Sequence, residues 1–154
     1  TRERWHLTPY DWDLLHWLAR THEIGMAIAH KHFNRHSAYV LRNADLPGFS
    51  QEEQELLAVL ALGQRGKLRT DFLTDSGDTE PSRTLYLLTI MRLASCFKYV
   101  EKLEQLPDFS IEARDTSLTL EFPKGWLEDH PLTARELSAE QTVLGKLGLK
   151  LKIN

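Results

Sequence analysis

The chain has 154 residues, of which 42% are hydrophobic and 27% are charged, and its formal net charge at pH 7 is -3. This size and composition are typical of one folded domain, or of one domain with a small appendage, and they argue against disorder. Because the net charge is slightly negative, general nucleic-acid binding is not expected. An anion could be held only by a local basic patch.

The cysteine content restricts the kinds of site that the chain can build. Cys96 is the single cysteine, so an intrachain disulfide framework and a thiolate-only zinc cluster are excluded. This usage suits a reducing compartment, and the sequence has no apolar stretch long enough to span a bilayer. We therefore expect a cytoplasmic protein without a membrane span.

The first predicted helix lies in residues 8–28. Thr8 before Pro9 is typical of an N-cap followed by the first helical residue. Apolar residues spaced by three and four positions then predict one buried helix face. The residues on that face are Trp12, Leu15, Leu18 and Ala19.

Three more helices are predicted in this part of the chain. Residues 32–44 place apolar side chains on one side, and Ser50 opens a capping box for a helix that ends near Gly63. The polar stretch 63–81 predicts a loop. Residues 82–105 then predict a largely buried helix of about twenty residues, because apolar positions occur nearly all round it.

The pattern changes after Pro107. A helix is predicted over 138–148, with Ser138 as its N-cap and Gly148 just past its end. Three segments around it alternate apolar and polar residues with period two and predict strands: 109–113, 116–123 and 149–153.

These elements predict an α+β fold in two units. The first, residues 1–106, is a mostly helical bundle, and the second, residues 107–154, is a small α/β unit. A sheet of so few short strands needs a partner for its apolar face, so we expect the helices to cover it.

The histidines are concentrated in one segment, next to Glu23. Adjacent imidazole and carboxylate groups can hold a divalent metal, and two histidines four residues apart share one helix face, as two ligands of one ion need. A metal-dependent phosphohydrolase site built from His22, Glu23, His32 and His36 is therefore one hypothesis. Structural or anion-binding histidines are the other, favoured because no second segment supplies carboxylates at ligand spacing. The clustered histidines are His22, His30, His32 and His36.

Two short basic segments accompany the histidines. If they lie side by side, they form a cationic groove without base-stacking aromatics, which suits a chain of phosphates. A solvated, salt-bridged surface is the alternative. The basic residues are Lys31, Arg35 and Arg42 in the first segment and Arg65, Lys67 and Arg69 in the second.

Several runs of the sequence resemble one enzyme family in order and spacing. They are "HEIG" at 22–25, "HSAYVLRNADLPGFS" at 36–50, "EEQELLA" at 52–58, "LYLLTIMRLA" at 85–94, "TSLTLEFPKGWLEDHPL" at 116–132 and "LKLKI" at 149–153. Together they resemble the C-terminal region of the exopolyphosphatase and guanosine pentaphosphate phosphohydrolase family. Of the two branches, we favour the exopolyphosphatase one.

The resemblance implies a division of labour within a longer protein. Family members carry N-terminal actin-like domains with the catalytic acids and a Mg²⁺ site, followed by a helical domain similar to the HD metal phosphohydrolases and a small α/β domain. This chain would be most of the HD-like bundle, truncated at its N-terminal side, plus the last domain. It would hold no cofactor and would be inactive alone.

The run "HEIG" departs from the HD pattern in one informative way. Glu23 stands where an HD enzyme has its defining aspartate, so His22 and Glu23 are expected to be only the remains of a metal site. The family has a His-Arg pair after the third predicted helix, and this chain reads Gln64-Arg65. Of that pair, this chain therefore keeps only the arginine, Arg65.

The resemblance implies that this part of the protein holds inorganic polyphosphate in a basic channel, forms a homodimer and contacts its own N-terminal catalytic domains. A guanosine pentaphosphate phosphohydrolase is the alternative within the family, and a metal-dependent HD-type enzyme or a purely structural dimerising module are alternatives outside it. The residues expected to bind polyphosphate are Lys31, His32, Arg35, His36, Arg65 and Lys67.

Overall fold

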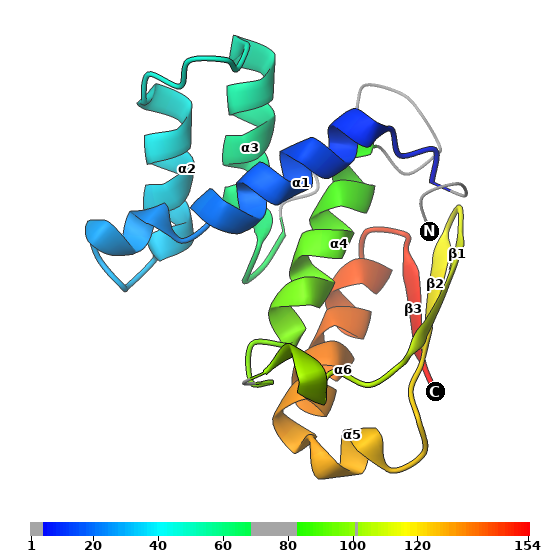
Figure 1. Ribbon diagram of the computed structural model, residues 1–154. Coiled ribbons are helices and arrows are strands. Elements are labelled where there is room, and N and C mark those ends of the chain that lie inside the picture. The colour runs from blue at the N-terminus through cyan, green and yellow to red at the C-terminus, as the bar shows by residue number, and fades with distance from the viewer. Residues whose placement is uncertain (1–4, 69–82, 101) are drawn as a thin grey trace.

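The computed structural model describes residues 5–68, 83–100 and 102–154 (Figure 1). It confirms the α+β class, because helices precede and flank a three-stranded sheet. Within these residues, no helix combines the length and the apolar character needed to cross a membrane. In chain order the elements are α1 (Pro9–Thr21), η1 (Ile24–Ala27), α2 (Phe33–Asn43), α3 (Gln51–Gly63), α4 (Arg83–Cys96), η3 (Leu103–Gln105), β1 (Ser110–Arg114), β2 (Ser117–Glu121), α5 (Trp126–Asp129), α6 (Pro131–Gly145) and β3 (Lys150–Ile153).

Helix α1 begins at the predicted N-cap and is tied there to α4. The Thr8 side chain accepts from the Asp11 amide, and the Asp11 carboxylate accepts from the Thr8 amide at 2.7 Å, which completes a capping box. Arg83, at the start of α4, forms an ion pair with the same carboxylate. Asp11 is therefore a buried acid that joins the starts of two helices.

The prediction of which α1 residues are buried is confirmed for two of the four residues. Leu15 and Leu18 are buried as predicted, but Trp12 and Ala19 are exposed, and Leu14 is buried in their place. The core-facing stripe of α1 therefore runs through Leu14 and not through Trp12, because α1 crosses α3 and also contacts α4 (Figure 1).

Helices α2 and α3 lie side by side as an antiparallel pair (Figure 1). At their joined ends, Arg42 donates two hydrogen bonds of 2.6 Å to the Glu55 carboxylate. The Gln54 side chain donates to the carbonyls of Leu41, at 3.2 Å, and Ala44, at 2.8 Å. These bonds satisfy carbonyls that the end of α2 leaves without intrahelical partners.

The segment between α1 and α2 approaches α2 closely at Gly25. The Gly25 amide donates to the Ser37 hydroxyl at 2.9 Å. A Cβ at position 25 would overlap the Phe33 carbonyl oxygen and the Ser37 amide nitrogen. Only glycine therefore fits where the "HEIG" run passes the backbone of α2.

The sheet has the order β1-β2-β3, with β2 antiparallel to β1 and parallel to β3. The parallel pair aligns Leu118 with Leu151, and its crossover connection contains α5 and α6. Helix α6 contacts both β3 and α4 (Figure 1). Leu137 and Leu144 of α6 are fully buried, so this helix fills the space between the sheet and α4.

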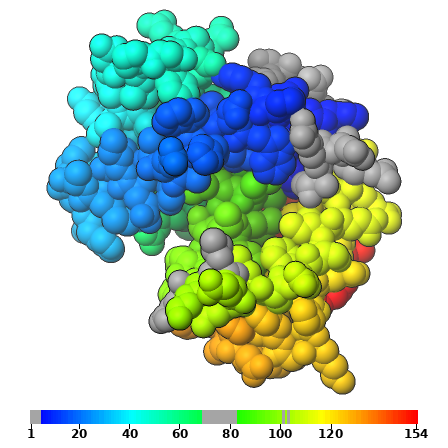
Figure 2. All heavy atoms as spheres, viewed as in Figure 1, coloured from blue at the N-terminus to red at the C-terminus, as the bar shows by residue number. Residues whose placement is uncertain are grey.

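The sheet and the helices share one buried cluster, as expected for so small a sheet. Ala113, Leu118 and Leu120 of the sheet belong to the same cluster as Leu88 and Leu93 of α4. In the space-filling view, α4 lies between the blue and cyan helices and the yellow and orange C-terminal part (Figure 2). Helix α4 is thus the element on which both sides of the molecule pack.

Several predicted helix boundaries are wrong. The helix predicted within 8–28 ends at Thr21, and the short 3-10 helix η1 follows it. Helix α4 ends at Cys96 and does not continue toward residue 105, because Phe97 leaves the helix to pack with Phe109, at a ring distance of 5.5 Å, and with other aromatic rings. Helix α6 begins at Pro131, so Ser138 lies inside it and is not its N-cap. Proline is well suited to the first helical position, since its fixed φ matches the helix and its missing N–H has no helical partner there.

Replacing Gly25 should destabilise the fold. We expect Gly25→Ala to lower the free energy of unfolding by about 1–3 kcal/mol or more, since the added methyl group meets backbone atoms that cannot rotate away. Gly145→Ala is the control, because its Cβ would meet no atom within 4 Å. It should be neutral or slightly stabilising in the same urea titration. Equal effects of the two substitutions would contradict the close approach.

Asp11 should make stability depend on pH. Burial alone would raise its pKa, but hydrogen bonds from Thr8 and the Arg83 guanidinium outweigh this and hold the pKa below its ordinary value of 3.8. The folded protein therefore binds the proton less readily than the unfolded chain, so the stabilisation is present above about pH 4 and is lost as pH falls through the folded pKa.

Urea titrations at neutral pH and near pH 3 test this assignment. Asp11→Asn should cost about 1–3 kcal/mol at pH 7 and should flatten the acid-induced loss of stability. Asp13→Asn, at an exposed position of the same helix, should leave both quantities nearly unchanged. If Asp11→Asn lost stability at low pH as much as the wild-type protein does, Asp11 would not be the group that causes this loss.

Candidate functional site

The two basic segments meet at one cavity of about 480 Å³. The start of α2 forms one wall, the end of α3 and the residues after it form another, and Leu88 of α4 contributes from behind. We call this cavity the basic pocket, and it is lined among others by His32, Asn34, Arg35, Leu62, Arg65 and Lys67. Four of the six predicted binding residues are thus brought together.

Local structure explains why the start of α2 faces the end of α3. His32 is the residue before the first turn of α2 and has a left-handed backbone with φ of 60°. Asn34 then donates a hydrogen bond of 2.8 Å to the Leu62 carbonyl near the end of α3. This bond satisfies a carbonyl of the last helical turn and holds the two segments at the pocket.

The cations of the pocket differ from those of an ordinary salt-bridged surface. Among the described residues, no carboxylate pairs with Arg35, Arg65 or Lys67, whereas Arg42 is paired with Glu55. All three side chains are exposed. Within the described ranges, no ion pair neutralises these three charges, and Arg42 is not part of this group.

Arg65 has a further contact that holds it beside the cavity. Its guanidinium lies over the Phe33 ring, 5.1 Å from the centroid, which is a favourable cation–π distance. Gly66 follows with φ of 79°, so the chain turns directly between Arg65 and Lys67. The turn places the two cations at the same cavity.

The remaining predicted basic residues lie elsewhere. Lys31 is exposed just before α2, and His36 is half-buried one turn into the helix; neither lines the basic pocket. Arg69 lies outside the described residues, as does most of the predicted loop after Lys67.

His22 and Glu23 belong to a second cavity, of about 610 Å³, between the end of α1 and the end of α4. The His22 Nδ1–H donates to the Ala19 carbonyl at 2.9 Å, and its Nε2 is 3.8 Å from a Glu23 oxygen. His32 and His36 do not line this cavity, although Arg65 lines both cavities.

The donor set does not fit a metal ion. Among the described residues, no three His, Cys, Asp or Glu side chains lie close enough together to share one. His22 and Glu23 supply only one pair, and a bound divalent ion needs further ligands. We therefore assign no metal-dependent step to this part of the chain.

Gln64 has a structural place between the two cavities. Its side-chain amide is buried and donates to the carbonyls of His22, at 2.8 Å, and Ala61, at 2.9 Å. These bonds fasten the end of α3 to the end of α1. Gln64 thus fixes the chain directly before Arg65 and was not predicted to have this role.

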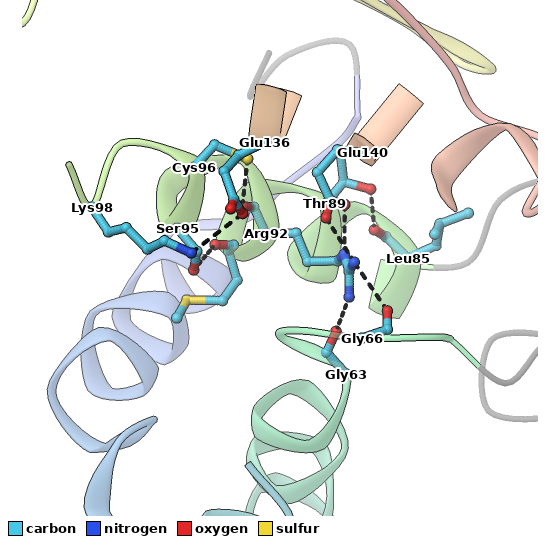
Figure 3. A network of polar contacts seen from close by, with 11 residues as sticks. Gly63, Gly66, Leu85, Thr89, Arg92, Ser95, Cys96, Lys98, Glu136 and Glu140 are labelled. Carbon is cyan, nitrogen blue, oxygen red and sulfur yellow. Dashed lines mark hydrogen bonds and ion pairs between the residues drawn. The ribbon is translucent and has the colours of Figure 1, made fainter. Parts of the chain in front are cut away.

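Behind the basic pocket lies a buried arginine that was not predicted as a site residue. Arg92 of α4 is 2% exposed and donates to both oxygens of Glu140 on α6 at 2.7 Å (Figure 3). It also donates to the carbonyls of Gly63, at 2.6 Å, and Gly66, at 3.2 Å. A charged residue within the apolar run "LYLLTIMRLA" was the available signal, since a buried charge requires partners.

Cys96 offers no nucleophile. It is buried within α4, and burial, followed by the nearby Glu140 and Glu136 carboxylates, raises the pKa of its thiol to about 12. The thiolate needed for nucleophilic chemistry is therefore strongly disfavoured. Cys96 therefore acts as a small buried apolar residue.

Comparison with known proteins shows to which family this chain is related. The family profile "Ppx/GppA phosphatase, domain III" matches residues 2–141. Two curated relatives, each named "Guanosine-5'-triphosphate,3'-diphosphate pyrophosphatase", are similar to most of the chain. That of Pseudoalteromonas translucida (strain TAC 125) is 38% identical over 141 residues, and that of Aeromonas salmonicida (strain A449) is 32% identical over 145 residues.

The matches cover 92% and 94% of this chain but only 28% and 29% of those relatives. The chain thus spans less than a third of their length. Both the family profile and the relatives confirm the resemblance found in the sequence, including its restriction to one part of longer proteins. The chain belongs to the Ppx/GppA phosphatase family, and its residues 2–141 match domain III of that family.

Proposed function

We propose that the basic pocket binds the phosphate chain of the substrate of a Ppx/GppA phosphohydrolase. The chain then grips the substrate, while the reaction takes place in other domains of the longer protein. One observation carries this proposal: cations from two separate segments meet at one cavity without carboxylate partners among the described residues.

The chemistry of the pocket suits phosphate oxygens. Arg35 and Arg65 each present a planar fork of donors that can bind two oxygens at once, and Lys67 adds a compact positive charge. The His32 ring adds nitrogen donors at the same cavity. Several such contacts along a phosphate chain give an affinity that grows with the number of phosphates, because each engaged contact raises the effective concentration of the next.

The names of the two relatives favour guanosine-5'-triphosphate,3'-diphosphate over inorganic polyphosphate as the substrate of the whole protein. The sequence analysis favoured the exopolyphosphatase branch, whereas these names favour the guanosine pentaphosphate phosphohydrolase branch. Both compounds carry a chain of phosphates, so the role proposed for the pocket is the same in either case. We propose further that the protein forms a homodimer and that this part contacts its own N-terminal catalytic domains. The helices are proposed to descend from an HD-like domain.

Neutralising the pocket should weaken phosphate binding. We expect Arg65→Gln with Lys67→Gln to lower the affinity for tripolyphosphate and guanosine pentaphosphate by about tenfold or more per lost charge-assisted contact. Isothermal titration at two salt concentrations measures this, and the dependence of log Kd on log salt concentration should become shallower. Phosphate release recorded in the same samples should stay at background, since the chain is proposed to lack the catalytic groups.

The matched control is Lys150→Gln with Lys152→Gln. These lysines are exposed on β3 and do not line the basic pocket. Both double variants therefore remove two positive charges, but only the first removes them from the pocket. The control should keep near wild-type affinity. Equal losses in both double variants would show that only the overall charge matters, and no binding by the wild-type chain would overturn the proposal.

A further inference from the structure

We infer that Arg92 is a positioning residue for the basic pocket, and that Glu140 on α6 sets phosphate affinity through it. The inference rests on the proposed function, because it names the group that holds the binding segment in place. Neither residue lines the pocket. Their effect would be exerted through the backbone of the segment from Gly63 to Gly66.

The first step is the geometry of the guanidinium. Arg92 Nη1 donates to the Gly63 carbonyl at 2.6 Å, and Nη2 donates to the Gly66 carbonyl at 3.2 Å. These two carbonyls bracket Arg65, and Lys67 follows directly. Figure 3 shows both dashed lines running from one side chain to the two glycines. One planar group thus fixes both ends of a short turn.

The second step is what fixes the guanidinium itself. Nε and Nη2 of Arg92 each donate to one oxygen of the Glu140 carboxylate at 2.7 Å. This two-point pairing sets the plane of the guanidinium, so its remaining N–H groups are aimed at the carbonyls. The side chains of Arg92 and Glu140 are 2% and 14% exposed, and a buried pair is screened little by water or salt.

The third step joins this arrangement to the pocket. The turn holds its conformation around Gly66, whose φ is 79°. With both bracketing carbonyls drawn toward Arg92, Arg65 reaches the Phe33 ring and lines the cavity together with Lys67. Releasing the carbonyls would let the turn adopt other conformations. The two cations would then spend less time together at the pocket, and an anion would have to order the turn on binding.

The test uses the whole chain with Glu140→Gln, which removes the charge and keeps the size of the side chain. Two quantities are measured: hydrogen exchange of the amides at 64–68 without ligand, and the Kd for tripolyphosphate. We expect exchange at 64–68 to rise by about tenfold or more and Kd to rise about three- to tenfold. Circular dichroism should show that the variant remains folded.

Glu136→Gln is the matched control on the same helix. Glu136 pairs with Lys98 at 3.3 Å, and both side chains are exposed, so its loss should change neither the exchange at 64–68 nor Kd. If Glu140→Gln fails to fold, Glu140→Asp takes its place. The shorter side chain keeps the charge but cannot reach both guanidinium nitrogens in the same pose, and it should raise Kd and exchange in the same direction.

The outcomes separate this inference from the proposed function. If the wild-type chain binds tripolyphosphate and a folded Glu140 variant shows unchanged Kd and exchange, the inference is wrong and the proposed function stands. If the wild-type chain binds no phosphate compound, the proposed function and the link to affinity both fail. The exchange measurement then still decides whether Glu140 holds the turn.

Discussion

The buried charge of Arg92 is the constraint on which much of the structure depends. Its guanidinium needs partners from three places at once: the carboxylate of Glu140 on α6, the carbonyl of Gly63 at the end of α3 and the carbonyl of Gly66 just after it. Leaving such a group without its partner costs ~3–5 kcal/mol. Helices α3, α4 and α6 must therefore keep their mutual placement, and the sheet that packs beside α6 is kept with them.

The position of the basic pocket follows from this arrangement and from smaller polar ties around it. Asn34 joins the start of α2 to the end of α3, and Gln64 joins the end of α3 to the end of α1. The cations themselves are exposed and have no carboxylate partner among the described residues, so buried polar groups hold the backbone while the charges face outward. Such a division suits a site that must bind an anion without rearranging, because the backbone is ordered before the ligand arrives.

The sequence predicted what local patterns encode. The N-cap at Thr8 and the capping box at Ser50 were predicted from neighbouring residues, and both are present. The alternating strands after Pro107 are present as well. The end of α4 was not predictable, because it depends on Phe97 meeting aromatic rings from later in the chain. The pairing of Arg92 with Glu140, 48 residues away, leaves no local pattern either. The sequence predicted a basic groove only on the condition that the two basic segments lie side by side. Lys31 and His36, which were also predicted to bind, do not line the pocket.

The central claim is that a chain of phosphates binds between the start of α2 and the residues that follow α3. Amide chemical-shift changes on adding tripolyphosphate test it most directly, because they locate the ligand without altering the protein. We predict that the largest changes fall within 32–35 and 63–68, and that they diminish as salt is added. Changes centred on the lysines of β3, or spread evenly over all exposed basic residues, would contradict the account.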